Sequence, residues 1–217
     1  MTGRPGDRVE RMRALTRAAH GGQTRNAGRV PYWVHTDAVA DICRGALANA
    51  AGVGEVVAAA EDVVLAAYGH DLYEDTSVSR DLIRREFGDR VDRWIADLTN
   101  ERGDADRAEY LRHLAATEDE VRVVKCADLI DNLLSVAYGL HDLGLPWARR
   151  FLLPIATETR DVLMTTPFAR LPGVGRQMLG LVDWAWERLA GSMATADGQG
   201  WAESAGGVEA GPAVATG

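Results

Sequence analysis

The sequence predicts an all-α protein, a helical bundle around one hydrophobic core. Apolar residues recur at spacings of three and four along nearly the whole chain, strict alternation is absent, and Ala, Leu, Arg and Glu, which favour helices, dominate. No strand is needed to account for this pattern. With 217 residues, 47% of them hydrophobic, the chain can bury one sizeable core, so we expect a single domain over residues 1–190.

The first three helices are bounded by segments rich in Gly. A helix is expected over 7–20, before the loop GGQTRNAGRVP (21–31), and a second over 36–51, before AGVG (51–54). The third, over 55–72, contains the run VVLAAYG and is apolar on every side, which predicts that it is buried.

The remaining helices follow the same punctuation. We expect them over 79–86, 88–99, 105–117, 119–140, 146–165 and 174–190, with breaks at NERGD, LGLP and TPFARLPGVG. From Gly191 onward the chain is rich in Gly, Ala and Ser and has no periodicity, which predicts a disordered tail over 191–217.

Charge and composition exclude several classes of partner. The formal net charge is -8, whereas a nucleic-acid polymer or an anionic membrane requires a basic face. The N-terminal segment lacks the apolar region of a signal peptide, and no apolar run is long enough to span a membrane, so we expect a cytoplasmic protein. Cys43 and Cys126 lie far apart in apolar stretches and are expected to be reduced core residues.

The helix expected over 119–140 carries one polar stripe on an otherwise apolar surface. At about 100° per residue its polar side chains fall within an arc of roughly 120°. They are Lys125, Asp128, Asp131, Asn132 and Ser135. Short Asp, Asn and Ser side chains suit a lined cleft, whereas an ordinary solvated face would carry long Lys and Glu; both interpretations stay open from this helix alone.

The segment HDLYEDT (70–76) concentrates charge at the end of the buried third helix. His70 and Glu74 are one helical turn apart, as are Asp71 and Asp75, so we expect all four side chains on one side of the helix. The adjacent His and Asp can offer a nitrogen and a carboxylate oxygen to one divalent cation. Glu74 and Asp75 then lie a turn further on, in position for proton transfer.

A second imidazole follows the first Gly-rich loop, in PYWVH. This imidazole belongs to His35. Together with His70, Asp71 and Asp128 it gives a set of two imidazoles and two carboxylates from three helices. Mixed nitrogen and oxygen ligands suit Mn²⁺, Fe²⁺, Co²⁺ or Zn²⁺ better than Ca²⁺. The other histidines lack such neighbours and are expected to be surface or structural residues: His20, His113 and His141.

These segments together resemble the HD phosphohydrolase superfamily, and within it the RelA/SpoT-type alarmone hydrolases with their small single-domain relatives. The resemblance runs from about Arg25 to Ser135, within a motif core of about 25–140. It rests on RNAGRVPYWVH, HDLYEDT, FGDRV, YLRHL and VRVVKCADLIDNL. It implies an all-α HD-domain bundle with a Mn²⁺ site, for which Fe²⁺, Co²⁺, Zn²⁺ and Mg²⁺ are alternatives.

The resemblance also implies roles for individual residues. The metal ligands would be His35, His70, Asp71 and Asp128. Glu74 and Asp75 would be the catalytic carboxylates that manage the attacking water. Asn132 would hold the substrate ribose or phosphate, Arg25 would lie against the nucleobase, and Lys125 and Ser135 would complete the substrate-binding set.

The chain departs from the pattern of that family at several positions. Leu129 and Leu134 stand where basic residues are common, Asp131 replaces His or Tyr, and Asn26 stands where a Lys often follows the Arg. Gly69 replaces the large apolar residue that precedes the HD pair. Because most of these changes remove positive charge or add negative charge, a nucleotide with fewer phosphates is expected to compete with ppGpp as substrate, while ppGpp stays the leading expectation from the resemblance.

Three functional hypotheses follow. The first is a (p)ppGpp 3′-pyrophosphohydrolase, and the second an HD-type phosphatase that removes phosphate from a nucleotide or nucleoside monophosphate in specialised metabolism. The third is a catalytically inactive nucleotide-binding module. In each case the partner is a small phosphorylated nucleotide, with no nucleic-acid polymer and no membrane; a homo-oligomer stays open.

Overall fold

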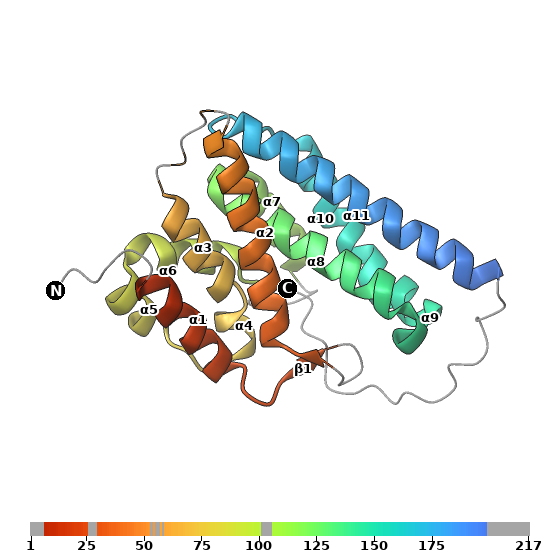
Figure 1. Ribbon diagram of the computed structural model, residues 1–217, viewed down its shortest axis with the longest axis horizontal. Helices are drawn as coiled ribbons and strands as arrows, with labels where there is room; N and C mark the ends of the chain where they lie inside the picture. The colour runs from red at the N-terminus through yellow and green to blue at the C-terminus, as the bar shows by residue number, and fades with distance from the viewer. Residues whose placement is uncertain are drawn as a thin grey trace.

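Helices make up nearly all of the structure, a computed structural model that describes residues 7–25, 30–52, 54, 57, 59–100 and 106–198. The prediction of an all-α bundle is confirmed (Figure 1). The helices are α1 (Asp7–Ala19), α2 (Trp33–Gly52), α3 (Ala60–Gly69), α4 (Leu72–Asp75), α5 (Arg80–Phe87), α6 (Asp89–Leu98), α7 (Arg107–Ala116), α8 (Asp119–Leu143), α9 (Leu145–Trp147), the π-helical turn η2 (Ala148–Leu152), α10 (Leu153–Thr165) and α11 (Pro172–Gly198).

Helix α8 is the centre of the bundle. It packs along α11 and also contacts α2, α3, α6, α7 and α10. Figure 1 shows α11 beside α8, with α1, α3, α5 and α6 gathered on the left of the view. Every residue from 119 to 130 is buried, polar ones included. The polar stripe of this helix therefore begins inside the protein.

The buried third helix is interrupted where the charged segment begins. Helix α3 ends at Gly69, and the chain turns at His70 and Asp71, which has φ −100° and ψ 2°, before α4 starts. The prediction of one helix over 55–72 is therefore wrong at its C-terminal end, and most of 55–58 lies outside the described residues. The Asp75 amide still donates to the Asp71 carbonyl at 3.0 Å, which holds α4 close to the turn.

A short hairpin precedes α2. Strands β1 (Thr24–Arg25) and β2 (Val30–Pro31) pair antiparallel, so the expectation that no strand is needed is wrong here. Two residues per strand are too few to show the alternation by which a strand is recognised in sequence. Helix α2 begins at Trp33, earlier than the expected 36, and so includes His35 in its first turn.

The C-terminal helices differ from the expected ones in detail. The helix expected over 146–165 is divided by η2; Pro154, at the start of α10, has no amide hydrogen to donate to the preceding turn. Helix α11 continues to Gly198, so the boundary expected at Gly191 is too early, and 199–217 lie outside the described residues. Among the described helices, none is long and apolar enough to cross a membrane. Cys43 and Cys126 are free and buried, as predicted.

Candidate metal centre

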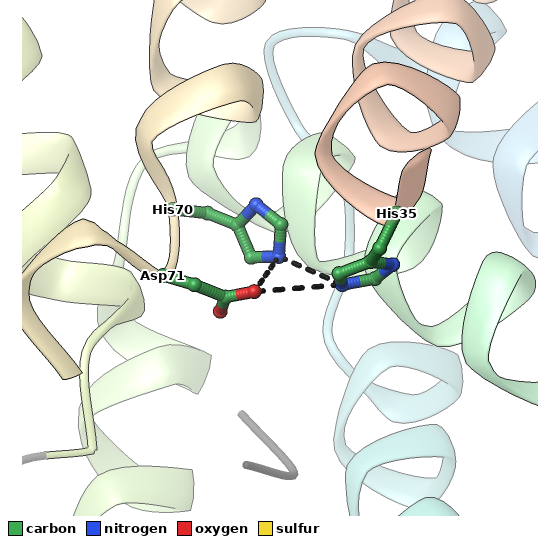
Figure 2. A group of neighbouring side chains, drawn as sticks. All are labelled: His35, His70 and Asp71. Atoms are coloured by element: carbon green, nitrogen blue, oxygen red, sulfur yellow. Dashed lines mark hydrogen bonds and ion pairs between the residues drawn. The ribbon is translucent and has the colours of Figure 1, made fainter. Parts of the chain in front are cut away.

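The structure brings together the four residues predicted as metal ligands. Figure 2 shows His35, from α2, facing His70 and Asp71, from the turn between α3 and α4. The two Nε2 atoms are 3.1 Å apart, and Asp71 Oδ2 lies 2.9 Å from His70 Nε2 and 3.5 Å from His35 Nε2. Asp128 Oδ1, from α8, lies 3.2 Å from His35 Nε2 and 3.7 Å from His70 Nε2. All four are buried.

The outer nitrogen of each imidazole has a partner of its own. His70 Nδ1 is 2.8 Å from the Ala67 carbonyl oxygen, and His35 Nδ1 is 2.7 Å from Asp131 Oδ2. Each acceptor holds a proton on Nδ1, so Nε2 faces the centre of the cluster, where it can offer its lone pair to a cation. This is the tautomer that a metal-binding histidine needs.

The spacing of these atoms fits a divalent cation. Two ligands bound at about 2.1 Å to one ion lie about 3.0 Å apart in octahedral geometry and about 3.4 Å apart in tetrahedral geometry. The distances here run from 2.9 to 3.7 Å. Burial would lower the pKa of His70, but the Asp71 and Asp128 carboxylates raise it well above its usual value. The site therefore favours positive charge at its centre.

Further side chains hold the two carboxylates in place. The Tyr32 hydroxyl donates to Asp71 Oδ2 at 2.7 Å. Lys125 Nζ donates to Asp128 Oδ2 at 2.8 Å, and Asn132 Nδ2 donates to Asp128 Oδ1 at 2.7 Å. Lys125 is buried, and although burial alone would lower the pKa of its ammonium group, Asp128 raises it. Lys125, predicted to bind substrate, is placed to hold Asp128.

The two predicted catalytic carboxylates lie on α4, beside the cluster. Burial, together with the charge of Asp71, raises the pKa of Glu74 to about 7 and that of Asp75 to about 6. Glu74 Oε1 accepts a hydrogen bond from the Asn100 amide. Asp75 Oδ2 is buried and has no hydrogen-bond partner among the described residues. Asp75 Oδ2 is thus open to a proton or a water near neutral pH.

Comparison with curated proteins found a distant relative in sequence. The chain is 27% identical over 191 residues to a guanosine-3′,5′-bis(diphosphate) 3′-pyrophosphohydrolase of Aquifex aeolicus (strain VF5), covering 84% of this chain and 24% of that protein. It thus spans about a quarter of the length of this relative. No family model matches the chain.

A solved structure shares the fold of this chain. The chain superposes with a TM-score of 0.58, at 21% identity, on a metazoan ortholog of SpoT that hydrolyzes ppGpp and plays a role in starvation responses, over 82% of this chain and 96% of that one. The chain is thus similar in sequence and in fold to SpoT-type ppGpp hydrolases. Its helices form the HD-domain bundle that the motifs predicted.

Some residues around the cluster of His35, His70, Asp71 and Asp128 were not found by sequence reasoning. His20, expected to be a surface or structural residue, is fully buried, and its ring stacks on Tyr32 with the centroids 4.8 Å apart. Gln23 Oε1 accepts a hydrogen bond from His20 Nδ1 at 2.7 Å, and Gln23 Nε2 donates to the Asp75 carbonyl at 2.7 Å. Tyr32 lies inside the PYWVH motif, but nothing local in the sequence marks His20 or Gln23.

The remaining predicted substrate residues line the same side of α8 or reach it from the hairpin. Arg25 is buried, with its guanidinium bound to Asp131 Oδ2 at 2.5 Å and to Asn132 Oδ1 at 2.8 Å. In this arrangement the charged end of Arg25 is paired with α8, whereas the resemblance implied contact with a nucleobase. Ser135 lies half-buried, one turn after Asp131.

The positions at which this chain departs from the pattern of the family it resembles have structural counterparts. Leu129 is buried in the core, and Leu134 is partly buried against it, while Asn26 lies outside the described residues. A Cβ added to Gly69 would lie 2.6 Å from Ile95 Cδ1, so Ile95 takes the space that a larger residue would need. The charge of Asp131 is met by Arg25 and His35, so it is not a free negative charge as the sequence suggested.

Proposed function

We propose that this HD domain is a metal-dependent phosphohydrolase acting on a small phosphorylated nucleotide, with (p)ppGpp 3′-pyrophosphate hydrolysis as the leading activity. The observation that carries the proposal is the buried set of His35, His70, Asp71 and Asp128 beside two carboxylates of raised pKa. A relative of this chain is named as a 3′-pyrophosphohydrolase of guanosine-3′,5′-bis(diphosphate). We further propose Mn²⁺ as the cation and a cytoplasmic location.

The chemistry divides between the cation and the protein. A bound divalent cation would neutralise phosphate charge and make a nearby water more acidic. Glu74 or Asp75 takes the proton of the attacking water, because their pKa values of about 7 and about 6 suit a general base at neutral pH. The water oxygen then bonds to the phosphorus that is attached to the 3′ oxygen. The bond from this phosphorus to the 3′ oxygen breaks, and the 3′ oxygen is protonated as pyrophosphate leaves.

A second candidate is a phosphatase acting on a nucleotide or nucleoside monophosphate. Among the described residues around the cluster, Arg25 and Lys125 carry positive charge, and both are paired with carboxylates, Asp131 and Asp128. A substrate with many phosphates would have to compete for these cations. A monophosphate needs fewer of them, so this arrangement favours it.

The deciding experiment measures phosphate and pyrophosphate release from ppGpp, pppGpp and a panel of nucleoside monophosphates with Mn²⁺ present. Pyrophosphate release from ppGpp supports the leading activity, and phosphate release from monophosphates alone supports the second. An inactive nucleotide-binding module, the third hypothesis, would bind members of the panel without turnover.

A carboxylate variant tests the assigned chemistry on whichever substrate reacts. Glu74→Gln with Asp75→Asn preserves shape but removes both proton acceptors, so kcat should fall by about 10²–10⁴ while substrate still binds. The matched control is Asp161→Asn with Glu187→Gln, two exposed acids on α10 and α11, which should leave kcat unchanged. Full turnover in the Glu74 and Asp75 variant would show that these residues are structural.

A further inference from the structure

A single guanidinium connects two of the four ligand residues. Arg25 Nη1 donates to Asp131 Oδ2 at 2.5 Å, and the same oxygen lies 2.7 Å from His35 Nδ1. Arg25 Nη2 donates to Asn132 Oδ1 at 2.8 Å, and Asn132 Nδ2 donates to Asp128 Oδ1 at 2.7 Å. Each branch runs from one nitrogen of Arg25, through one side chain, to one ligand.

We propose that Arg25, Asp131 and Asn132 form a positioning network that fixes His35 and Asp128 for metal binding. The inference rests on the metal site of the proposed function and assigns to Arg25 and Asp131 a task in that site. It differs from the role that the family resemblance implied for Arg25, which was contact with a nucleobase. It also assigns Asp131 a role in the metal site, whereas in the sequence its negative charge only argued against a highly phosphorylated substrate.

Asp131 determines how the His35 imidazole is oriented. A carboxylate that accepts from the outer nitrogen of a metal-binding histidine fixes its tautomer and ring plane and raises its basicity. The other imidazole is held differently, because His70 Nδ1 faces the main-chain carbonyl of Ala67. Replacing a side chain can therefore release His35 but cannot remove the acceptor of His70.

Arg25 keeps Asp131 in that role. Asp131 is only partly exposed, with 19% of its side chain accessible, and a free carboxylate so close to the cluster could itself turn toward a cation. The guanidinium holds the same oxygen that faces His35 and brings positive charge to it. Because Arg25 comes from β1 while Asp131 and Asn132 come from α8, the network also ties the hairpin to the central helix.

The test measures metal affinity in the protein without nucleotide. Mn²⁺ and Co²⁺ binding are followed by calorimetry, and the visible spectrum of the Co²⁺ form reports its coordination. Asp131→Ala and Arg25→Met should each weaken binding by about 10- to 100-fold, as loss of outer-shell partners does. Asp131→Asn, which retains an acceptor for His35 Nδ1 but not the ion pair, should lose less than Asp131→Ala and decides the question if the alanine variant does not fold.

The matched control is Arg160→Met, since Arg160 on α10 likewise binds a carboxylate of another element, that of Asp183 on α11 at 2.6 Å. It should bind both metals as the wild type does. The proposal is overturned if Arg25→Met leaves metal affinity and the Co²⁺ spectrum unchanged and raises only the KM for nucleotide. It is also overturned if the Asp131 variants lose thermal stability but bind metal normally.

The two levels of inference fail in different ways. A wild-type protein that binds neither Mn²⁺ nor Co²⁺ would remove the metal site and with it the proposed function. Tight binding by the wild type, with equally tight binding by the Arg25 and Asp131 variants, would remove the positioning network alone.

Discussion

Replacing Gly69 by alanine should destabilise the protein through one atom of a residue on another helix. Gly69 is the last residue of α3, next to His70, and the new Cβ would lie 2.6 Å from Ile95 Cδ1 and 3.4 Å from Leu72 Cδ1. Carbon atoms in contact are ordinarily about 3.5–4.0 Å apart. Ile95 and Leu72 are both fully buried, so neither side chain can move into solvent.

The expected magnitude follows from two opposing effects. Overpacking of a filled core costs about 1–3 kcal/mol, whereas Gly to Ala in a helix gains at most about 1 kcal/mol. The free energy of unfolding of Gly69→Ala should therefore fall by about 1–2 kcal/mol. Ile95→Val alone should cost about 0.5–1.5 kcal/mol, because it deletes the buried Cδ1 methyl group.

A double-mutant cycle isolates the contact. Gly69→Ala with Ile95→Val removes the clashing atom, so the pair should be no less stable than Ile95→Val alone, a coupling of about 1–2 kcal/mol. Urea unfolding of the metal-free proteins gives the four free energies. The control is Gly180→Ala, at an exposed position in α11 with no atom within 4 Å of the new Cβ, which should be stabilising. Additive effects of Gly69→Ala and Ile95→Val would refute the reasoning.

Three further predictions concern the cluster. His70→Ala should remove a ligand, so metal content and activity fall together; elemental analysis showing a full complement of metal in this variant would contradict the assignment. Lys125→Met leaves the Asp128 carboxylate buried without its ammonium partner and should cost about 3–5 kcal/mol in the metal-free protein, and less with saturating Mn²⁺, as urea unfolding under both conditions would show. In the metal-free protein burial raises the pKa of Glu74 from 4.5 to about 7. The folded state therefore holds this proton more tightly than the unfolded state, and the stabilisation present below about pH 4.5 should be lost as the pH rises to about 7. Glu74→Gln should remove that part of the pH dependence of the free energy of unfolding, and an unchanged profile would count against the raised pKa.

The sequence alone determined the fold class and the set of candidate ligands. Both depend on patterns that are local in the chain. Helical periodicity reports which side of each segment is apolar, and this placed Lys125 and Asp128 on a polar stripe of α8. HDLYEDT places an imidazole and three carboxylates together at the end of a buried run, and PYWVH supplies a second imidazole, which was enough to group His35 with His70 as candidate ligands.

Tertiary structure decided how the side chains around that set are used. Arg25 and Asp131 are 106 positions apart, and no local pattern indicates that they meet. His20 is buried because Tyr32 packs on its ring, and the space beside Gly69 is filled by Ile95 from α6. Each of these contacts joins segments that only the packing of the helices brings together. A residue's partner, and hence whether its charge is free or paired, depends on that packing and not on its neighbours in sequence.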